Sequence, residues 1–338
     1  MKYTRLGSTG TQVSRLCLGT MSFGSMADWM ISEADSFAIV KKALEAGINF
    51  FDTADAYSRG QSEQILGRAL KEHAARRDEI VVATKCYVPM AAGPNRAGLS
   101  RKHIMHAIDD SLKRLGMDYI DLYQIHRFDY HTPIDETIDA LNDVVKAGKA
   151  LYVGASSMLS YQFAKYLLRA DAKNCTRFVT MQNQYSLLYR EEEREMNPLC
   201  REEGVGLIPW GPLAGGRLAG NRQAGTTRAK SPMYAERFNR PEDEAVIDAL
   251  NAVANERGES PVQVALAWLL AKPGVTAPII GATKLSQLDA PIAAVEVSLS
   301  SDEISRLEAS YVSQPPVGSM PSPNDPPIAA PKVRSGRG

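Results

Sequence analysis

Apolar and polar residues alternate along the chain in a pattern that predicts short strands separated by helices. The predicted strands are the apolar runs near residues 16–18, 48–52, 80–84, 119–125, 150–155, 178–183, 205–210 and 277–281. The predicted helices cover residues 35–46, 62–73, 101–115, 132–148, 160–170, 191–203, 242–257 and 261–271. Strand–helix alternation repeated eight times favours an α/β fold in which a parallel sheet closes into a (β/α)8 barrel, also called a TIM barrel.

Residues 101–115 carry the clearest helical pattern. Ile104, Ile108 and Leu112 form one apolar stripe at helical spacing. Ser100 is suited to cap the first turn, and Gly116 to end the last one. The pattern therefore predicts both the helix and its two ends.

Residues 2–14 predict a β-hairpin, because two strand-like segments flank Gly7, Ser8 and Gly10. We expect this hairpin to close the bottom of the barrel. A doubly wound open sheet is the alternative fold. Such sheets usually bind dinucleotides through G-x-G-x-x-G after the first strand, and residues 18–24 lack that spacing.

The expected organisation is one barrel domain over residues 1–312, followed by a tail. Residues 313–338 are rich in Pro, Ser and Gly with little to bury, so we expect them to be disordered. Two long loops, 86–99 and 211–240, follow the third and seventh strands. Loops of this length are often binding segments or lids.

Composition narrows the class of protein. The chain has 338 residues, 44% of them apolar, and a formal net charge of zero, so nothing in its charge favours nucleic acid or an anionic membrane as a partner. The apolar stretch 262–271 is too short to span a bilayer, and the N-terminus lacks the apolar core of a signal peptide. The four cysteines form no C-x-x-C pair. We therefore expect a cytoplasmic protein with reduced thiols and no metal, and a homo-oligomer remains compatible with the sequence.

Three successive strands end in an ionisable residue. Asp52 ends the second strand, Lys85 the third and His126 the fourth, while Tyr57 follows on the loop after the second. Taken singly, Lys85 can be a solvated strand end, His126 a core histidine and Tyr57 a loop aromatic. Because the carboxyl ends of barrel strands surround one pocket, we expect the four side chains to face each other.

These residue types suit the protonation of an oxygen on which charge is building. A lysine ammonium about 4 Å away contributes roughly 4 kcal/mol, or about three pKa units, so we expect Lys85 to bring the pKa of Tyr57 near neutrality. Asp52 would keep Lys85 charged, and His126 would donate a hydrogen bond that orients a substrate oxygen. Such an apparatus suits the reduction of a carbonyl by an external hydride.

The chain resembles the aldo-keto reductases. The matching segments are NFFDTADAY (49–57), GQSE (60–63), ATK (83–85), DLYQIH (121–126), GASS (154–157), QNQY (182–185), PWGPLAGG (209–216) and PIIGATK (278–284). They occur in family order across residues 1 to about 312, and the first ten residues look like the branch of bacterial NADP-linked reductases with broad carbonyl substrates. The resemblance implies a catalytic tetrad of Asp52, Tyr57, Lys85 and His126.

The resemblance also implies that NADP(H) binds in an extended form without a Rossmann domain. The cofactor-binding residues that it implies are Gly19, Thr20, Met21, Ser156, Ser157, Gln182, Trp210, Gly211, Pro212, Leu213, Gly215, Arg217, Gly281, Thr283, Lys284 and Gln287. Ser156, Ser157 and Gln182 would hold the nicotinamide amide, and Trp210 would stack on its ring. The segment 213–217 would wrap the pyrophosphate, and the segment 281–287 would meet the 2′-phosphate.

This sequence departs from the family pattern at several cofactor positions. Many members have Asn in place of Ser157, Tyr in place of Trp210 and Arg in place of Gln287. Lys284 and Arg217 also have an alternative interpretation as ordinary surface charges. The strictness of the NADP preference therefore stays open.

For the substrate, Trp29, Tyr87 and Phe128 follow the first, third and fourth strands, so they are candidates to line an apolar pocket. Each can instead simply pack its loop. Aromatic walls would favour aromatic or medium-length aldehydes and ketones, and the expected partner is such a small carbonyl compound. Two rival functions remain: a redox-sensing subunit that holds NADP(H) with slow turnover, and a barrel lyase or isomerase that needs no nicotinamide.

Overall fold

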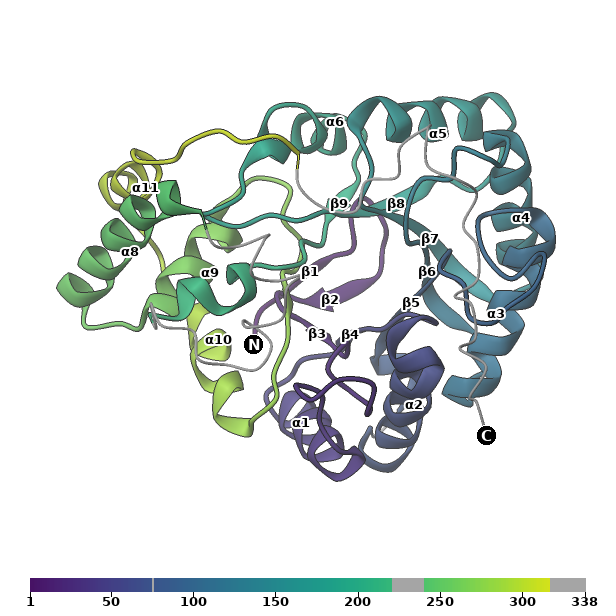
Figure 1. Ribbon diagram of the computed structural model, residues 1–338, viewed down its shortest axis with the longest axis horizontal. Helices are drawn as coiled ribbons and strands as arrows, with labels where there is room; N and C mark the ends of the chain where they lie inside the picture. The colour runs from purple at the N-terminus through teal and green to yellow at the C-terminus, as the bar shows by residue number, and fades with distance from the viewer. Residues whose placement is uncertain (75, 221–239, 317–338) are drawn as a thin grey trace, which may run out of the picture.

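Eight parallel strands carry the fold, in a computed structural model that describes residues 1–74, 76–220 and 240–316 (Figure 1). In spatial order the strands are β10 (Ile279–Ile280), β3 (Cys17–Gly19), β4 (Phe50–Asp52), β5 (Val81–Cys86), β6 (Ile120–Ile125), β7 (Ala150–Ser156), β8 (Phe178–Gln182) and β9 (Gly206–Leu207). The ring closes between β9 and β10, where the N–H of Ile279 donates to the carbonyl of Pro209 at 2.8 Å. The predicted (β/α)8 barrel is confirmed, and the open doubly wound sheet is excluded.

Helices surround the strands on the outside. They are α1 (Glu33–Glu45), α2 (Gln61–His73), α3 (Arg101–Leu115), α4 (Ile134–Lys146), α5 (Ser160–Ala172), α6 (Met196–Glu202), α8 (Glu244–Arg257), α9 (Pro261–Ala271), α10 (Asp289–Ala294) and α11 (Ser301–Glu308). The predicted helix 101–115 has the expected bounds. Ser100 accepts a hydrogen bond from the N–H of His103, and Gly116 ends the helix in the left-handed conformation.

Several predicted boundaries were wrong. The single helix predicted over 191–203 is a short 3-10 turn, η3 (Glu191–Glu193), followed by α6, because the chain at Glu195 leaves the helical conformation. The helix predicted over 242–257 likewise begins with a 3-10 turn, η5 (Pro241–Asp243). Helices α10 and α11 were not predicted at all. Each is short, with six and eight residues, so its apolar pattern extends over few turns.

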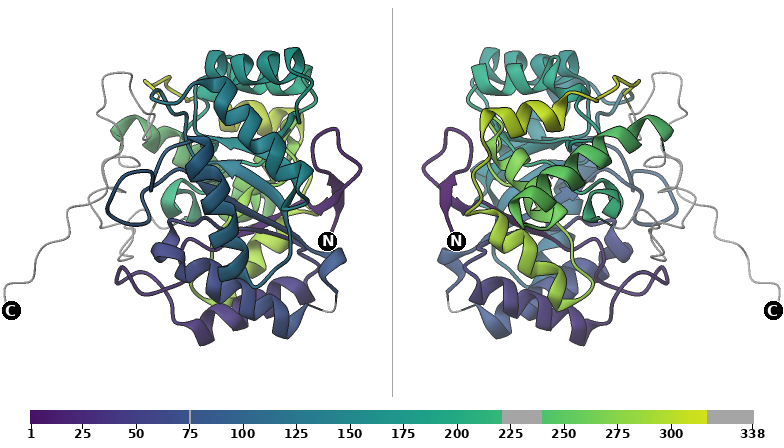
Figure 2. Two further views of the ribbon diagram at one scale, coloured as in Figure 1. Left: turned by 90° about the vertical axis from the view of Figure 1, so that its right-hand side faces the viewer. Right: turned by 90° about the vertical axis from the view of Figure 1, so that its left-hand side faces the viewer.

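The predicted hairpin forms and covers one end of the barrel. Strand β1 (Tyr3–Arg5) pairs antiparallel with β2 (Gln12–Ser14). Leu6 and Val13 of this hairpin are fully buried against Phe50 and Ala83 in the barrel interior. Figure 2 shows the hairpin on one side of the barrel and the loops that follow β3 and β5 on the other. The hairpin therefore closes the end opposite to the loops that follow the strands.

The predicted loop 211–240 is only partly described. Its first residues form a 3-10 segment, η4 (Ala214–Ala219), and residues 221–239 lie outside the described residues. At the other end of the chain, Gln314 donates from its side chain to the carbonyl of Leu188 at 2.8 Å. The disorder predicted for the tail concerns mainly residues 317–338, which are also outside the described part, and it stays a prediction.

Helices α2 and α3 approach closely because Gly67 has no side chain. A Cβ atom added at Gly67 would lie 2.1 Å from the backbone carbonyl oxygen of Leu115. We predict that Gly67→Ala lowers the free energy of unfolding by about 1–3 kcal/mol, although alanine is the better helix former by about 1 kcal/mol. Chemical denaturation measures this change. Gly10→Ala is the control, because nothing lies within 4 Å of the added atom there. Equal stability of the two variants would contradict the close-contact interpretation.

Candidate active site

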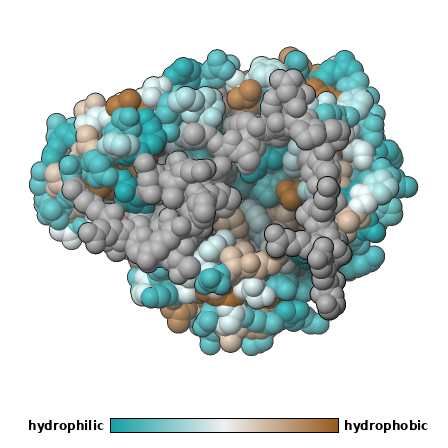
Figure 3. All heavy atoms as spheres, viewed as in Figure 1, coloured by the Kyte–Doolittle hydropathy of each residue, from teal (hydrophilic) through white to brown (hydrophobic). Residues whose placement is uncertain are grey.

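Polar side chains form one layer at the carboxyl ends of the barrel strands. Successive residues of a strand point to opposite faces, so Phe50 and Asp52 both point into the barrel, and so do Ala83 and Lys85. Phe50 and Ala83 belong to an apolar interior, whereas Asp52 and Lys85 are the last inward-pointing residues of their strands. The apolar layers below therefore support a buried polar layer above. Figure 3 views the molecule onto this end and shows a hollow near the centre of the face.

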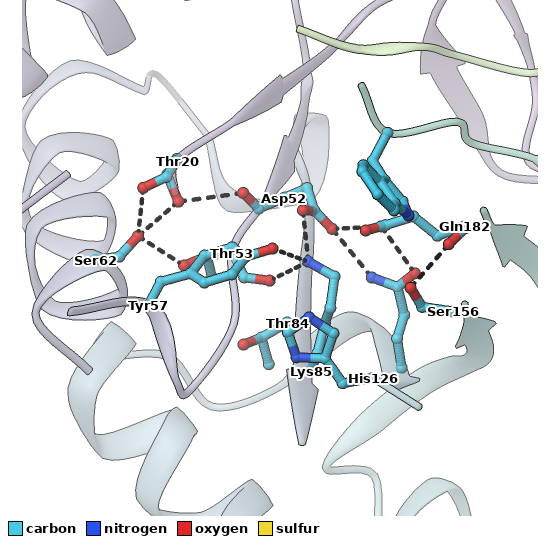
Figure 4. A network of polar contacts seen from close by, with 12 residues as sticks. Thr20, Asp52, Thr53, Tyr57, Ser62, Thr84, Lys85, His126, Ser156 and Gln182 are labelled. Atoms are coloured by element: carbon cyan, nitrogen blue, oxygen red, sulfur yellow. Dashed lines mark hydrogen bonds and ion pairs between the residues drawn. The ribbon is translucent and has the colours of Figure 1, made fainter. Parts of the chain in front are cut away.

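Lys85 lies between Asp52 and Tyr57 (Figure 4). Its Nζ atom donates to Asp52 Oδ2 at 2.6 Å and to the carbonyl of Thr53 at 2.7 Å, and it lies 3.3 Å from the phenol oxygen of Tyr57. The Lys85 side chain is fully buried, and that of Asp52 is only 3% exposed. Burial by itself lowers the pKa of Lys85, but Asp52 and Tyr57 outweigh it and the pKa is raised. The lysine is therefore charged at neutral pH.

A tight turn holds Tyr57 in place. Tyr57 begins the segment η1 (Tyr57–Gly60), in which Ser58 and Arg59 adopt left-handed backbone angles with φ of 49° and 51°. Non-glycine residues rarely adopt such angles, and they persist only where the surroundings fix them. Here the hydroxyl of Ser58 is buried and donates to the carbonyl of Phe23 at 3.0 Å. The turn thus directs the phenol of Tyr57 toward Lys85 instead of toward solvent.

The expected lowering of the Tyr57 pKa toward neutrality is not found in this structure. Burial raises the pKa of Tyr57 more than Lys85 lowers it, so the net direction is upward. The sequence argument counted the charge of Lys85 but not the loss of water around the phenol. At neutral pH Tyr57 therefore carries its proton.

His126 lies beside Tyr57, with ring centroids 5.9 Å apart and planes nearly perpendicular at 78°. Burial, helped by the charges of Arg127 and Lys85, lowers the pKa of His126 well below its ordinary value. The imidazole is therefore neutral at pH 7. Because a neutral imidazole carries one N–H, it can donate a single hydrogen bond to an oxygen held between it and Tyr57.

The residues predicted for the nicotinamide side adjoin this layer. Gln182 Nε2 donates to Asp52 Oδ1 at 2.8 Å, and the hydroxyl of Ser156 donates to the backbone carbonyl of Gln182 at 2.8 Å. The indole N–H of Trp210 donates to the hydroxyl of Ser157 at 3.1 Å. Ser156, Ser157, Gln182 and Trp210 therefore form one continuous group, joined to the tetrad through Asp52.

The segment predicted to wrap the pyrophosphate follows Trp210. Gly211, Gly215 and Gly216 have positive φ values of 68°, 67° and 102°, so the backbone turns sharply here and continues past Pro212 and Leu213 into η4. Arg217 is paired with Glu244 of α8 at 2.5 Å. The Arg217 side chain is only 12% exposed, so it is not an ordinary surface charge, and its contact with a pyrophosphate stays a prediction.

The predicted adenosine side lies after β10. The side-chain oxygen of Gln287 accepts from the backbone N–H groups of Thr283 at 2.7 Å and Lys284 at 3.2 Å. Gln287 therefore caps the 3-10 segment η6 (Leu285–Leu288), a role that the sequence did not reveal. The hydroxyl of Ser22 donates to the carbonyl of Ala282 at 3.2 Å. Gly281, Thr283 and Lys284 thus lie next to the loop that follows β3.

In that loop, the residues predicted to bind cofactor have different surroundings. Gly19 packs tightly, since an added Cβ would lie 2.6 Å from Ile279 Cγ2. Thr20 is buried, and its hydroxyl lies 3.1 Å from the carbonyl of Asp52 and 2.7 Å from the hydroxyl of Ser62. Met21 is half-buried. Thr20 therefore supports the backbone of Asp52, whereas Met21 has a surface that can meet a ligand.

The candidate substrate residues also differ in how exposed they are. Trp29 is half-buried on the loop after β3. Tyr87 and Phe128 are buried, and the ring of Phe128 packs edge-on against Tyr130 at 4.8 Å and Tyr166 at 5.8 Å. This packing favours the interpretation of Phe128 as a residue that supports its loop, and leaves Trp29 as the more accessible candidate.

Two buried polar residues of the site were missed from the sequence. Gln124 points inward from β6 and donates to Asp52 Oδ1 at 3.1 Å. Asp55 is fully buried, and neither of its carboxylate oxygens has a hydrogen-bond partner among the described residues. Gln124 lies two residues before His126, and residues two apart on a strand point to the same face. This spacing could have indicated from the sequence that Gln124 points into the barrel. Nothing in the sequence indicates that Asp55 is buried.

Two absences bear on the candidate chemistry. In residues 1–74, 76–220 and 240–316, no group of three His, Cys, Asp or Glu side chains is arranged to hold a metal ion. Over the same ranges, none of the helices has the length and apolar character needed to cross a membrane.

Comparison with known proteins identifies the family. The model of the Aldo/keto reductase family matches residues 15–312, so the chain belongs to this family and is an oxidoreductase of the kind that reduces carbonyl groups. Among similar proteins, an aldo-keto reductase of Alternaria alternata is 43% identical over 94% of this chain and 93% of its own. The versiconal hemiacetal acetate reductase of Aspergillus parasiticus is 41% identical over 92% and 97% of the two chains. A putative aryl-alcohol dehydrogenase of Schizosaccharomyces pombe is 40% identical over 94% and 98%.

These relatives are fungal proteins. They give no support to the bacterial branch that the first ten residues suggested. A short N-terminal segment is a weak basis for assigning a branch, because it forms the covering hairpin and lies opposite to the site.

Asp55 generates a prediction about stability. Burial, together with the charge of Glu63, raises the pKa of Asp55 well above its ordinary value, against the opposing effect of Arg114. The folded protein therefore holds this proton more tightly than the unfolded chain does. The contribution of Asp55 to stability is greatest below about pH 4, the ordinary pKa of aspartate, and is lost as the pH rises toward the raised value.

We predict that Asp55→Asn, which cannot ionise, is more stable than the wild type at pH 8, and that this advantage shrinks as the pH is lowered toward 5. Unfolding midpoints in denaturant across this pH range measure the effect. Asp110→Asn, at an exposed position of α3, is the control and should show no comparable trend. An advantage of Asp55→Asn that does not vary with pH would contradict a buried titrating carboxyl.

Proposed function

We propose that this protein reduces aldehydes or ketones to alcohols with NADPH, and that Tyr57 is the general acid. The observation that carries the proposal is the position of Lys85 between Asp52 and Tyr57, beside a neutral His126. A charged lysine next to a protonated phenol is suited to stabilise the negative charge that the phenol acquires when it gives up its proton.

The side chains present fit a nicotinamide cofactor. Ser156, Ser157 and Gln182 offer hydroxyl and amide groups that match a carboxamide, and the half-buried indole of Trp210 offers a flat surface for its ring. When bound, the reduced cofactor supplies the hydride that the carbonyl carbon receives. The exposed ammonium of Lys284 favours the 2′-phosphate of NADP(H) on the adenosine side.

The residues of the chain then act on the carbonyl oxygen. The imidazole N–H of His126 and the phenol of Tyr57 hold the oxygen by hydrogen bonds, which orients the carbonyl carbon. As the oxygen gains negative charge, Tyr57 transfers its proton to it and the alcohol forms. Lys85 stabilises the resulting phenolate, and Asp52 keeps Lys85 charged and in place.

The relatives suggest a substrate class. One is named a hemiacetal acetate reductase, and another a putative aryl-alcohol dehydrogenase. An aryl alcohol is the product of reducing an aromatic aldehyde, so we propose aromatic carbonyl compounds as the first class to test. The half-buried indole of Trp29 is compatible with such a substrate.

Tyr57→Phe tests the general acid. We predict that turnover of NADPH with an activated aromatic aldehyde falls by about 10²- to 10⁴-fold, while the Kd for NADPH is unchanged. Absorbance of the reduced cofactor measures turnover, and tryptophan fluorescence measures binding. Tyr3→Phe, at the opposite end of the barrel, is the control and should keep wild-type activity. Turnover near that of the wild type in Tyr57→Phe would overturn the mechanism.

Lys284→Met tests the preference for NADPH. We predict that the Kd for NADPH rises about tenfold or more, because the ammonium no longer meets the 2′-phosphate, while the Kd for NADH is unchanged. Binding of both cofactors to both proteins is measured by fluorescence titration. If the Kd values for NADPH and NADH change equally, Lys284 does not recognise the 2′-phosphate.

A further inference from the structure

Gln124 lies at the centre of the buried polar layer, although no step of the mechanism uses it. It is fully buried on β6, and its Nε2 atom donates to Asp52 Oδ1 at 3.1 Å. Gln182 Nε2 donates to the same oxygen at 2.8 Å and to Gln124 Oε1 at 3.2 Å. The two amides and the carboxylate therefore form a closed triangle of hydrogen bonds.

The triangle determines the orientation of the Gln182 amide, that is, which way its nitrogen and its oxygen face. A carboxylate only accepts hydrogen bonds, so the nitrogen of the amide must face Asp52. The two N–H groups of that nitrogen are directed to Asp52 and to Gln124. The carbonyl oxygen of Gln182 consequently faces away from Asp52, and it is the group of this amide that the triangle leaves for a bound carboxamide.

The same triangle orients Asp52. Two amide donors meet Oδ1, which leaves Oδ2 for the 2.6 Å bond to Lys85. Hydrogen bonds to an ionised group are stronger than those between neutral groups. Gln124 thus helps to fix the carboxylate that in turn holds Lys85 next to Tyr57.

The barrel makes room for this arrangement. Gln124 pairs with Lys85 on one side and with Gly154 on the other. A Cβ atom added at Gly154 would lie 3.1 Å from Gln124 Cγ and 2.3 Å from Thr180 Oγ1. The absence of a side chain at Gly154 therefore leaves the space that the Gln124 side chain occupies.

We propose that Gln124 is a positioning residue that couples the nicotinamide-binding amide of Gln182 to the Asp52–Lys85 pair. This inference rests on the proposed function. It assigns to Gln124 the orientation of Gln182 for the cofactor carboxamide and of Asp52 for Lys85. A residue that only fills space in the barrel would do neither.

The first experiment measures coupling in cofactor binding. Gln124→Met has a similar shape but neither donates nor accepts through an amide. We expect it to raise the Kd for NADPH by about fivefold to tenfold. Gln182→Met should raise it too, and the double variant should fall short of the product of the two single effects, because both remove one shared triangle.

Thr180→Val is the matched control for this cycle. Thr180 is buried on β8 two residues before Gln182, and its hydroxyl has no hydrogen-bond partner among the described residues. The fold-change in Kd for NADPH caused by Thr180→Val should multiply with that caused by Gln182→Met, because the two residues share no hydrogen bond. Thermal unfolding of every variant sets a temperature at which all are folded. An unchanged Kd in Gln124→Met, or independent effects of Gln124 and Gln182, would overturn the proposal.

The second experiment uses the charge of a substituted side chain. Gln124→Glu keeps the size of the side chain, but an ionised carboxyl cannot donate to Asp52 and repels it. Protonated, the same carboxyl can donate as the amide does. We expect the turnover of Gln124→Glu, divided by the turnover of the wild type at the same pH, to increase by at least several-fold as the pH falls. Parallel pH profiles of the variant and the wild type would indicate a role in packing only and would overturn the proposal.

The two experiments separate this inference from the proposed function. If the wild type fails to bind NADPH or to reduce any carbonyl compound, the proposed function is wrong. If the wild type does both, and Gln124→Met and Gln124→Glu behave like it, then only the role of Gln124 is wrong.

Discussion

The buried ion pair between Asp52 and Lys85 is the interaction on which the rest of the site depends. Taking two charges out of water costs several kcal/mol for each ion, and the pair is tolerated only where further hydrogen bonds satisfy both partners. Here the carbonyl of Thr53 meets Lys85, and the amides of Gln124 and Gln182 meet Asp52. The positions of β4, β5, β6 and β8 are therefore all coupled to one pair of charges.

Burial acts on the neighbours of this pair in opposite directions and leaves them neutral. It raises the pKa of Tyr57 and lowers the pKa of His126, so the site holds a protonated phenol and an uncharged imidazole around one charged lysine. Both neutral groups can donate a hydrogen bond to the same oxygen. The environment of the barrel end, more than the residue types alone, thus sets the protonation states on which the proposed mechanism relies.

Much of this arrangement follows from local patterns. The apolar runs and helical stripes predicted the barrel, because each strand and helix must bury one face and the order of elements allows few topologies. Ionisable residues at the ends of successive apolar runs predicted Asp52, Lys85 and His126, because the carboxyl ends of barrel strands surround one pocket. Ser156 and Gln182 were predicted only through the resemblance to the family motifs.

Properties that depend on distant segments were beyond such patterns. The protonation of Tyr57 depends on how completely its phenol is buried, and that of Asp55 depends on its burial and on the nearby charge of Glu63. Gln124 matters through its contact with Gln182, 58 residues further along the chain. Local sequence determined which elements form and which faces they bury. Their assembly decided the free energies of charge and hydrogen bonding, because these depend on solvent exclusion and on atoms that meet only in the folded barrel.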